Sequence, residues 1–596
     1  MKQISHLSER VYFIILSAIA IILGNMAPVK AQNKSFFLAQ AQNIPPQDRP
    51  STIPLPDNEP VPPQQRVTPL PPIEDFLESP PSSIPNILAP DSQVQFEVKR
   101  FRIKDNSVFK PEELQPILNE YLDRPISFAD LLEIETKLTK LYLDKGYINS
   151  GVVIPAQDVS QNEIIIQAVE GTVEDITVNV KGRLRENYVR SRLQRGTKQP
   201  LNIDELQEAL QLLQLNPLIE NLNAELSVGS SRDRWNLAVD VNQANAFRPL
   251  LFINNSRTPS VGSFQRGLEL THLNLFGFGD RASVVYKNTN GSNDIDAGYT
   301  IPYNSLNGTV GLRYRYVSSD IIEEPFDDLD ISSQTSDYRL SVRQPIIVSA
   351  NANSTQEFAV GAEFSRQNNT TEFFVNGRNI ASLISSGADE DGETRISALR
   401  FFQDWTRRTR KDVLAVRSQF SVGLDLFDST VNVGRPDSKF VAWRGQAQWL
   451  RQLKASSNIN LLVRSDLQLS GDDLVPLERF SLGGIDSVRG YRQDALLGDN
   501  GWFLSTEVRV PFYRWSNDES NLSVIPFVDF GTTWSNSDSI NQDEDTVVST
   551  GLGLQLSLND MLRARLDYGI PLIEVEDSDD TLQENGVYFS VEYSPF

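Results

Sequence analysis

Cysteine is absent from this 596-residue chain, and the only histidines are His6 and His272. Without cysteine there is no disulfide framework, no thiolate nucleophile and no cysteine metal site. A catalytic triad or a histidine metal cluster is nearly excluded as well, because each needs an imidazole placed among partners. We therefore expect no catalytic residue, no bound metal and no cofactor, and the chain does not read as an enzyme.

Positive charge is in deficit: 55 Lys and Arg stand against 78 Asp and Glu, a formal net charge of −23. Because phosphates demand a basic face, nucleic acid is excluded as the partner. No phosphate-binding Gly-x-x-x-x-Gly-Lys-Ser/Thr loop occurs, and residues 276–280 hold only a lone Gly-x-Gly, which we interpret as a turn. Acidic clusters at 320–330, 389–393 and 577–580 have the carboxylate density that calcium prefers, but we interpret them as solvated loops between strands.

Long apolar runs are missing except near the N-terminus. Residues 11–24 form an apolar run of fourteen residues, preceded by two basic residues. A spanning helix needs about 20 such residues, whereas the core of a signal peptide is of this length. Residues 29–31 supply a cleavage site, with 39–41 as an alternative, so we predict a signal peptide over 1–31. No later stretch approaches the length of a spanning helix, which excludes a helical membrane protein and leaves a β-barrel open.

Proline is concentrated in one segment: 15 of the 33 prolines lie between residues 45 and 90. Such a segment can neither pair nor coil regularly, so we predict an extended, semi-rigid linker over 32–93. Docking of this segment onto a partner is the alternative interpretation.

Two units with the same order of elements follow, at 94–171 and 172–245. Each predicts a strand, two helices and two strands, and an internal repeat of this kind indicates duplicated small domains. Ser127 with Asp130 resembles a capping box that starts one helix, Asn202 with Glu205 a second, and Gly146 is a suitable stop. The predicted elements are 95–103, 110–122, 127–146, 151–159 and 163–171, then 173–180, 185–195, 202–216, 219–229 and 235–242.

After residue 247 a period of two takes over. In one segment Leu552, Leu554 and Leu556 alternate with glycine and glutamine. The polar face of such segments is rich in Arg, Asp, Gln and Gly, which matches a barrel with a polar lumen better than a soluble sandwich. At about 10 residues per crossing strand, residues 246–596 have room for a C-terminal 16-stranded antiparallel transmembrane β-barrel.

The last strand carries a further pattern. A glycine precedes alternating apolar positions, and the chain ends on an aromatic residue; these positions are Gly586, Phe589, Val591 and Phe596. We interpret the pattern as an outer-membrane address read by the barrel-assembly machinery. An ordinary last strand is the alternative.

Three short motifs resemble those of the two-partner secretion translocators, the outer-membrane transporters of haemolysin and filamentous-haemagglutinin type. Residues 488–491 match the V-R-G-[FY] loop motif, 498–501 with Glu507 continue the match, and 273–280 resemble the turn of the first barrel hairpin. The two repeated units resemble POTRA domains, so the resemblance covers residues 94–596. The motif residues are Val488, Arg489, Gly490 and Tyr491 in the loop, and Phe527, Asp529 and Gly531 in a later strand of the F-x-D-x-G type.

The resemblance implies that the loop folds back into the lumen, where Arg489 pairs with Asp529. Strand parity leads to the same placement, because Asp529 on the lipid face would be expensive while Val528 and Phe530 suit lipid. Whether the pair gates the channel or only stabilises the barrel stays open, and Arg492 receives no comparable partner. Some relatives of this kind carry a plug helix ahead of the linker; here only residues 32–43 are available for one.

The resemblance further implies a monomeric transporter in the outer-membrane bilayer, with its POTRA domains in the periplasm. These domains would capture an unfolded, exported partner of β-helical type by strand addition at 219–229 or 163–171. One alternative is a barrel-assembly insertase of the same superfamily, which usually carries more POTRA units. The other is a passive porin or an adhesin.

Overall fold

The computed structural model describes residues 95–595 apart from short gaps. The predicted signal peptide, the predicted linker and Phe596 lie outside the described residues. Over the described ranges, no helix has the length and apolarity needed to cross a membrane. The gaps are 159–161, 325, 352, 376–377, 382–386, 433–435, 455–457, 516–519, 537–544, 560 and 576–580.

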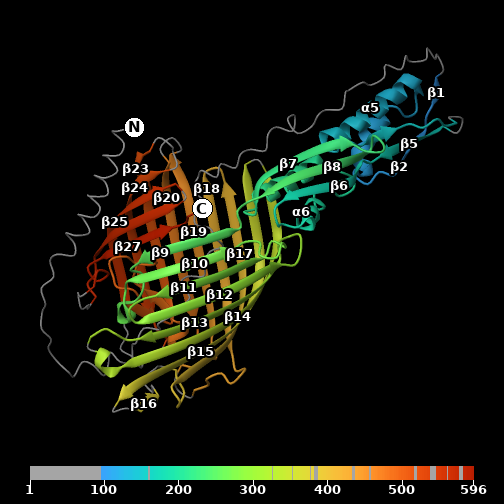
Figure 1. Ribbon diagram of the computed structural model, residues 1–596. Coiled ribbons are helices and arrows are strands. Elements are labelled where there is room, and N and C mark those ends of the chain that lie inside the picture. The colour runs from blue at the N-terminus through green and yellow to red at the C-terminus, as the bar shows by residue number, and fades with distance from the viewer. Residues whose placement is uncertain are drawn as a thin grey trace. The chain divides into compact units, whose positions relative to one another are not determined.

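The first α+β unit follows the predicted order of elements (Figure 1). Its sheet has the order β2-β5-β4, with β2 parallel and β4 antiparallel to β5. The core joins helix residues such as Ile134 to sheet residues such as Ile164. The elements are β1 (Phe96–Glu97), β2 (Arg100–Lys104), α4 (Pro111–Asn119), β3 (Pro125–Ile126), α5 (Phe128–Asp144), β4 (Gly151–Val153) and β5 (Glu163–Val169).

Helix α5 begins and ends where the sequence predicts. The Ser127 Oγ accepts a hydrogen bond from the Asp130 backbone N–H, and the Asp130 carboxylate accepts one from the Ser127 N–H at 2.7 Å, which completes the capping box. The helix ends before Gly146, whose φ of +85° suits glycine. Of the predicted apolar stripe, Leu131, Ile134, Leu138 and Tyr142 are buried.

The first unit departs from the prediction at its strands. The strand expected over 95–103 is divided into β1 and β2, and the one expected over 151–159 ends at Val153, because Pro155 has no backbone N–H for a ladder. Beyond that point the Gln157 side chain pairs with Ile165: its Nε2 donates to the Ile165 carbonyl at 2.8 Å, and its Oε1 accepts from the Ile165 N–H at 2.7 Å. A side-chain amide therefore caps this edge of β5.

The second α+β unit has a strand, two helices and two strands, without the extra short strands β1 and β3 of the first. Its sheet has the order β6-β8-β7, so β6 and β7 are the edge strands. The Asn202 side chain caps α7 by accepting from the Asp204 N–H at 2.9 Å, rather than forming the predicted pair with Glu205. The elements are β6 (Thr172–Lys181), α6 (Glu186–Leu193), α7 (Ile203–Gln214), β7 (Ile219–Val228) and β8 (Arg234–Gln243).

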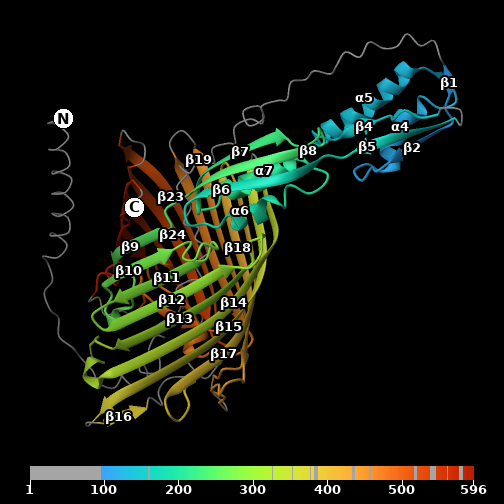
Figure 2. The same ribbon diagram turned by 45° about the vertical axis from the view of Figure 1, so that its right-hand side comes forward.

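The remaining described residues build a closed, antiparallel 16-stranded barrel, as predicted (Figures 1 and 2). The last strand, β27, pairs with the first, β9, and so closes it. A short strand, β16 (Arg378–Ala381), pairs with the end of β15. The sixteen strands are β9 (Phe247–Asn254), β10 (Gln265–His272), β11 (Arg281–Asn288), β12 (Ser292–Pro302), β13 (Thr309–Asp320), β14 (Ile331–Asn351), β15 (Ser354–Val375), β17 (Glu393–Thr409), β18 (Asp412–Leu424), β19 (Val441–Lys454), β20 (Ile459–Ser470), β23 (Asn500–Arg514), β24 (Asn521–Trp534), β25 (Asp545–Leu558), β26 (Leu562–Pro571) and β27 (Val587–Tyr593).

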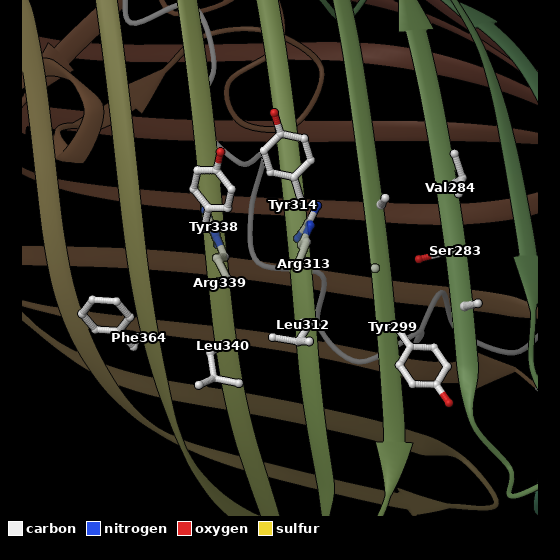
Figure 3. Close-up of a pocket in the computed structure, with 13 residues that line it drawn as sticks. Ser283, Val284, Tyr299, Leu312, Arg313, Tyr314, Tyr338, Arg339, Leu340 and Phe364 are labelled. Atoms are coloured by element: carbon white, nitrogen blue, oxygen red, sulfur yellow. The ribbon is translucent and has the colours of Figure 1, made fainter.

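The two faces of the barrel wall differ as the period of two predicts. Figure 3 shows a shallow apolar pocket on the outer face of β11 to β15, lined by Tyr314, Tyr338 and Phe364 among others. The neighbouring Arg313 and Arg339 point to the inner face, where Arg313 pairs with Asp296 and Arg339 with Asp337. Paired charges of this kind make the lumen polar and leave the outer face to lipid.

The outward side chains of β15 change character along the strand. They are apolar from Val360 to Phe364, which lies opposite Leu340 of β14, and polar from Arg366 to Thr370. Contact with hydrocarbon therefore ends near Phe364, although the strand continues to Val375. The outward residues, in chain order, are Val360, Ala362, Phe364, Arg366, Asn368 and Thr370.

Candidate functional site

The loop of residues 471–499, between β20 and β23, folds back against the inner wall of the barrel. A small hairpin of β21 (Phe480–Leu482) and β22 (Leu496–Gly498) gives the loop its own structure. Apolar loop side chains pack on two inward residues of the wall in one buried cluster. The cluster consists of Phe480, Leu482, Val488 and Tyr491 from the loop and Phe503 and Val547 from the wall.

The Arg489 guanidinium lies at the centre of a buried ion cluster. Its Nε donates to Asp529 Oδ2 at 2.7 Å, and its Nη2 donates to Asp529 Oδ1 at 2.9 Å. Its Nη1 donates to Glu507 Oε2 at 3.1 Å and lies 3.6 Å from Asp567 Oδ1. The guanidinium also stacks over the Phe527 ring, 3.5 Å from the ring centroid. A charge-assisted, bidentate pair in this setting fixes both the position and the orientation of the loop.

Asp529 is placed as the strand parity predicts. Its side chain is 0% exposed, whereas the neighbouring Val528 is 55% exposed on the outer face. Ser505 on the adjacent strand donates a hydrogen bond to Asp529 Oδ1 at 2.6 Å. Gly531 lies on the same inner face, where a Cβ atom would come within 2.7 Å of Leu482 and 2.9 Å of Val488. Phe527, Asp529 and Gly531 together form the surface on which the loop rests.

Two wall arginines complete the charge balance of the cluster. Arg565 contacts Glu507 at 3.0 Å and Asp567 at 2.6 Å, and Arg509 contacts Glu507 at 2.8 Å. Three carboxylates therefore meet three guanidinium groups, one of which comes from the loop. Sequence reasoning missed Asp567, Arg565 and Arg509 as members of the site. The alternation of polar and apolar residues in β26 predicts that Arg565 and Asp567 share its polar face. Their proximity to Asp529 depends on how β24, β25 and β26 pair, which the sequence does not reveal.

Arg464 on β20 lies at the margin of this cluster. It pairs across the sheet with Ser505, which in turn pairs with Asp529, so the three residues share one inward row. Among the described residues Arg464 forms no ion pair within 4.0 Å, its Nε has no hydrogen-bond partner, and its Nη1 donates only a long bond of 3.5 Å to the Asp486 carbonyl. A cation without a counter-ion of its own therefore lies within electrostatic range of Glu507 and Asp529.

Gly490 and Tyr491 fasten the loop through its backbone. Gly490 has a φ of +101°, a conformation that favours glycine, and its N–H donates to the Tyr588 hydroxyl at 2.9 Å. That hydroxyl donates in turn to the Tyr491 carbonyl at 2.5 Å. The Tyr491 hydroxyl lies 2.8 Å from the carbonyl oxygens of Val548 and Ile573. All four residues of the VRGY motif thus contact the wall or the core of the loop.

Arg492 was expected to have no comparable partner, and that expectation was wrong. Its Nη2 donates to Glu323 at 2.9 Å and its Nη1 to Glu584 at 3.0 Å. Glu323 lies between β13 and β14, and Glu584 precedes β27. The next residue, Gln493, is also held, because its N–H donates to the Gln583 side chain. The loop therefore has a second anchor near the outer ends of the strands.

The residues of the predicted C-terminal address lie on or beside β27. Gly586 precedes the strand with a φ of +72°, and its carbonyl accepts from the Gly569 N–H at 2.8 Å. Phe589 and Val591 alternate with Tyr588, which faces the loop, so they lie on the outer face. The Phe589 ring lies 6.1 Å from that of Phe264. Phe596, the fourth residue, is outside the described residues.

Comparison with known proteins decides the family. Residues 234–556 match the family model described as haemolysin secretion/activation protein ShlB/FhaC/HecB. The chain belongs to this family. Residues 96–171 separately match the ShlB-type POTRA domain, in agreement with the first α+β unit.

Named relatives of the family point the same way. The heme/hemopexin transporter protein HuxB of Haemophilus influenzae (strain 86-028NP) is 22% identical over 485 residues, which cover 78% of this chain and 82% of the relative. The outer membrane transporter CdiB of Dickeya dadantii is 21% identical over 466 residues, covering 76% and 78%. Two solved CdiB structures share the fold. The structure of CdiB from Escherichia coli has a TM-score of 0.64 at 19% identity and covers 87% of this chain and 94% of its own chain. The structure of CdiB from Acinetobacter baumannii has a TM-score of 0.59 at 16% identity and covers 85% of this chain and 91% of its own chain.

Membership of the haemolysin secretion/activation family settles the class of protein. This is a two-partner secretion transporter of the outer membrane, with its POTRA domains in the periplasm. Members of the family are transporters rather than enzymes, and they carry secreted partner proteins. The transporter is therefore favoured over the insertase and over the porin or adhesin.

Proposed function

We propose that the loop of residues 471–499 closes the transport path at rest and moves aside when an exported partner passes through the barrel. The observation that carries this proposal is Arg489, 1% exposed and held by Asp529 and Glu507 on the inner wall. Such a contact holds the loop firmly, yet the loop can leave as a unit. Glu507 retains Arg565 and Arg509 as counter-ions, so loop departure does not strip it of compensation.

The POTRA domains capture the unfolded partner by strand addition, with β7 as the docking edge. β7 is an edge strand of ten residues, long enough to pair with an extended segment through its backbone. The other edge considered from the sequence, 163–171, is less suitable. β5 lies between β2 and β4, and its remaining free edge at Ile165 is occupied by Gln157. Backbone pairing at β7 gives affinity without strict demands on the partner's sequence.

The proposal assigns the chain a signal peptide at 1–31, a linker at 32–93, POTRA domains at 94–171 and 172–245 and the barrel at 246–596. The protein acts as a monomer on a partner of β-helical type. Gly586, Phe589, Val591 and Phe596 form the address by which the barrel-assembly machinery inserts it. No nucleotide is needed at the site, and folding of the partner outside the cell can draw the chain through.

The loop proposal is tested with Arg489→Ala in cells that produce a cognate partner. Secreted partner is measured in the medium, and barrel folding by heat-modifiable migration on gels. We expect a folded barrel with at least tenfold lower secretion, while Arg266→Ala, at an exposed arginine of β10, secretes normally. Normal secretion by a folded Arg489→Ala protein would refute the gating role and leave Arg489 as a stabilising plug.

The docking edge is tested by cross-linking, which the absence of cysteine makes free of background. Asn223→Cys and Ser227→Cys place single thiols on exposed positions of β7. Thr177→Cys on β6, the opposite edge, is the matched control. Disulfides to cysteine-bearing partner segments should form on β7 and not on β6. Equal trapping on the two edges would contradict strand addition at β7.

A further inference from the structure

Basic side chains gather at one place on the barrel, in contrast to the chain's net charge of −23. They lie at the end of β17, in the turn that leads to β18, and at the end of β19. We call this set the basic rim patch: Arg407, Arg410, Lys411, Arg451 and Lys454. All five residues are solvent-exposed, and the Arg451 side chain is 48% exposed although it lies 3.6 Å from Asp412.

An apolar surface on the outer wall adjoins the basic rim patch. The strand register places Arg407 opposite Leu414, and Leu414 opposite Trp449, in one row across β17, β18 and β19. This row faces outward, because the alternating residue Asp404 faces the lumen, where it pairs with Arg343 and Arg417. The Arg451 guanidinium lies 5.6 Å from the centroid of the Trp449 ring. Cations at the rim thus adjoin a tryptophan and a leucine that face lipid.

Chain connectivity assigns the patch to the periplasmic end of the barrel. β9 follows the second POTRA domain directly, and the strands then alternate in direction around the closed, antiparallel sheet. The β17–β18 and β19–β20 turns therefore lie at the same end as the β10–β11 turn. Since the POTRA domains lie in the periplasm, this end meets the periplasmic leaflet of the outer membrane.

We propose that the basic rim patch binds the headgroup of an anionic phospholipid in the periplasmic leaflet. Guanidinium and ammonium groups are the side chains that bind phosphate esters, with arginine able to bind two oxygens at once. Tryptophan favours the level of the headgroups, and the acyl chain lies along Leu414 and Trp449. Residues 407–412 and 449–454 contain one acidic residue, Asp412, which pairs with Arg451, so positive charge exceeds negative charge in these segments.

The orientation of the patch favours lipid over the exported protein as its ligand. Arg343, which lines the transport path, pairs with the lumen carboxylates Glu357 and Asp404. Arg407 and Arg451 lie on the opposite, outward face, which a polypeptide inside the barrel does not reach. The proposal depends only on the barrel lying in the membrane and is independent of loop gating.

The test uses the full-length protein in nanodiscs containing phosphatidylethanolamine and phosphatidylglycerol in equal amounts. Native mass spectrometry measures which lipid stays bound. We expect the wild type to retain phosphatidylglycerol preferentially, and each of Arg407→Gln and Lys411→Gln to weaken that preference about fivefold. The combined variant Arg407→Gln/Arg410→Gln/Lys411→Gln/Arg451→Gln should show no preference.

A charge-matched control distinguishes lipid binding at the patch from a general effect of the protein's net charge. Lys99, Arg100, Lys104 and Lys110 are exposed on the first POTRA domain, and their joint replacement by Gln should leave the lipid preference intact. Heat-modifiable migration checks folding, and the single variants carry the test should the combined variant fail to fold. Unchanged phosphatidylglycerol retention in the single variants, or equal loss in the control, would overturn the proposal. A patch variant that loses cross-linking to the exported protein but retains phosphatidylglycerol like the wild type would also overturn the proposal. The patch would then bind the exported protein.

Discussion

Arg489 and Asp529 lie 40 residues apart in sequence and form a bidentate pair in which neither side chain is more than 1% exposed. Arg489 belongs to the loop of residues 471–499 and Asp529 to the barrel wall. The pair therefore forms only when the loop is packed against the inner wall. Around it, the wall carries carboxylates and arginines that remain when the loop is removed.

Removing one charge of the pair should cost more than removing both. Asp529→Ala leaves Arg489 buried against Glu507 and Asp567 with an excess positive charge, a situation that costs about 3–5 kcal/mol. Arg489→Ala/Asp529→Ala leaves Glu507 and Asp567 balanced by Arg509 and Arg565 and should cost less. Denaturant unfolding of the barrel in detergent, followed by tryptophan fluorescence, measures both. A double variant as unstable as the sum of the single variants would contradict this balance.

Gly569→Ala should unseat the loop without altering any charge. A Cβ atom at this position would lie 2.5 Å from the Gly490 nitrogen and 2.7 Å from the Arg489 carbonyl carbon, and backbone atoms cannot make way as a side chain can. We expect protease cleavage within residues 479–499 and a larger open-channel conductance in planar bilayers. Gly471→Ala is the control, because its Cβ meets nothing within 4 Å. Equal protease resistance in the two variants would show that the loop tolerates the displacement.

Arg464 should become important only when Arg489 is lost. It lies in the row of Ser505 and Asp529 without an ion pair of its own in the described part of the chain, so Arg464→Gln alone should change stability by less than about 1 kcal/mol. In the Arg489→Ala background Arg464 is a cation that stays within electrostatic range of Asp529, and the same substitution should cost roughly 1–2 kcal/mol more. A double-mutant cycle on barrel unfolding gives this coupling. Strict additivity would remove the role assigned to Arg464.

Arg492→Gln should loosen the outer anchor while leaving the buried cluster intact. Its pair with Glu323 is partly exposed on both sides and contributes about 0–1 kcal/mol, whereas the Glu584 side chain is buried. The variant removes a cation from this buried carboxylate, so we expect a lower unfolding midpoint and faster hydrogen exchange in residues 581–586 and 321–324. Exchange as slow as in the wild type would show that Gln493 and Gln583 hold the loop without Arg492.

Helix α5 should lose protection at acidic pH. Hydrogen bonds from the Ser127 hydroxyl and then its backbone N–H hold the pKa of Asp130 below its usual range. Because the folded pKa is depressed, the cap contributes fully above the unfolded value of about 3.9 and is lost as the pH falls through the folded value. Asp130→Asn should remove roughly 0.5–2 kcal/mol of helix protection at neutral pH and abolish this acid dependence. Hydrogen exchange across α5 between pH 6 and pH 3 measures both; an unchanged acid dependence in the variant would assign it to another group.

The sequence was sufficient for the order of elements and for the face on which Asp529 lies. Both depend on local periodicity: a helix stripe such as Leu131 to Tyr142, and the alternation around Asp529. It was not sufficient for the partners of Arg492, which lie 169 and 92 residues away in two other loops. The membership of Asp567 in the buried ion cluster could not be predicted for a related reason, because its neighbours depend on the pairing register of three strands. The early end of β4 at Val153 was readable from Pro155, but nothing local predicts that Gln157 pairs with Ile165.

The change of character along β15 has a consequence for the cell surface. From Arg366 to Thr370 the strand carries polar side chains on the face that touches hydrocarbon lower down, and its ladder to β14 continues unbroken. The loop after β18 lies on part of this face, because Arg366 donates a hydrogen bond to the Ser429 hydroxyl at 3.2 Å and the Phe427 ring lies 5.8 Å from that of Phe364. Loop residues rather than lipid therefore cover the outer side of the sheet at this level. The barrel wall thus extends past the level of Phe364 on the side where the secreted protein emerges, and we expect membrane-impermeant labels to reach the polar residues there in intact cells.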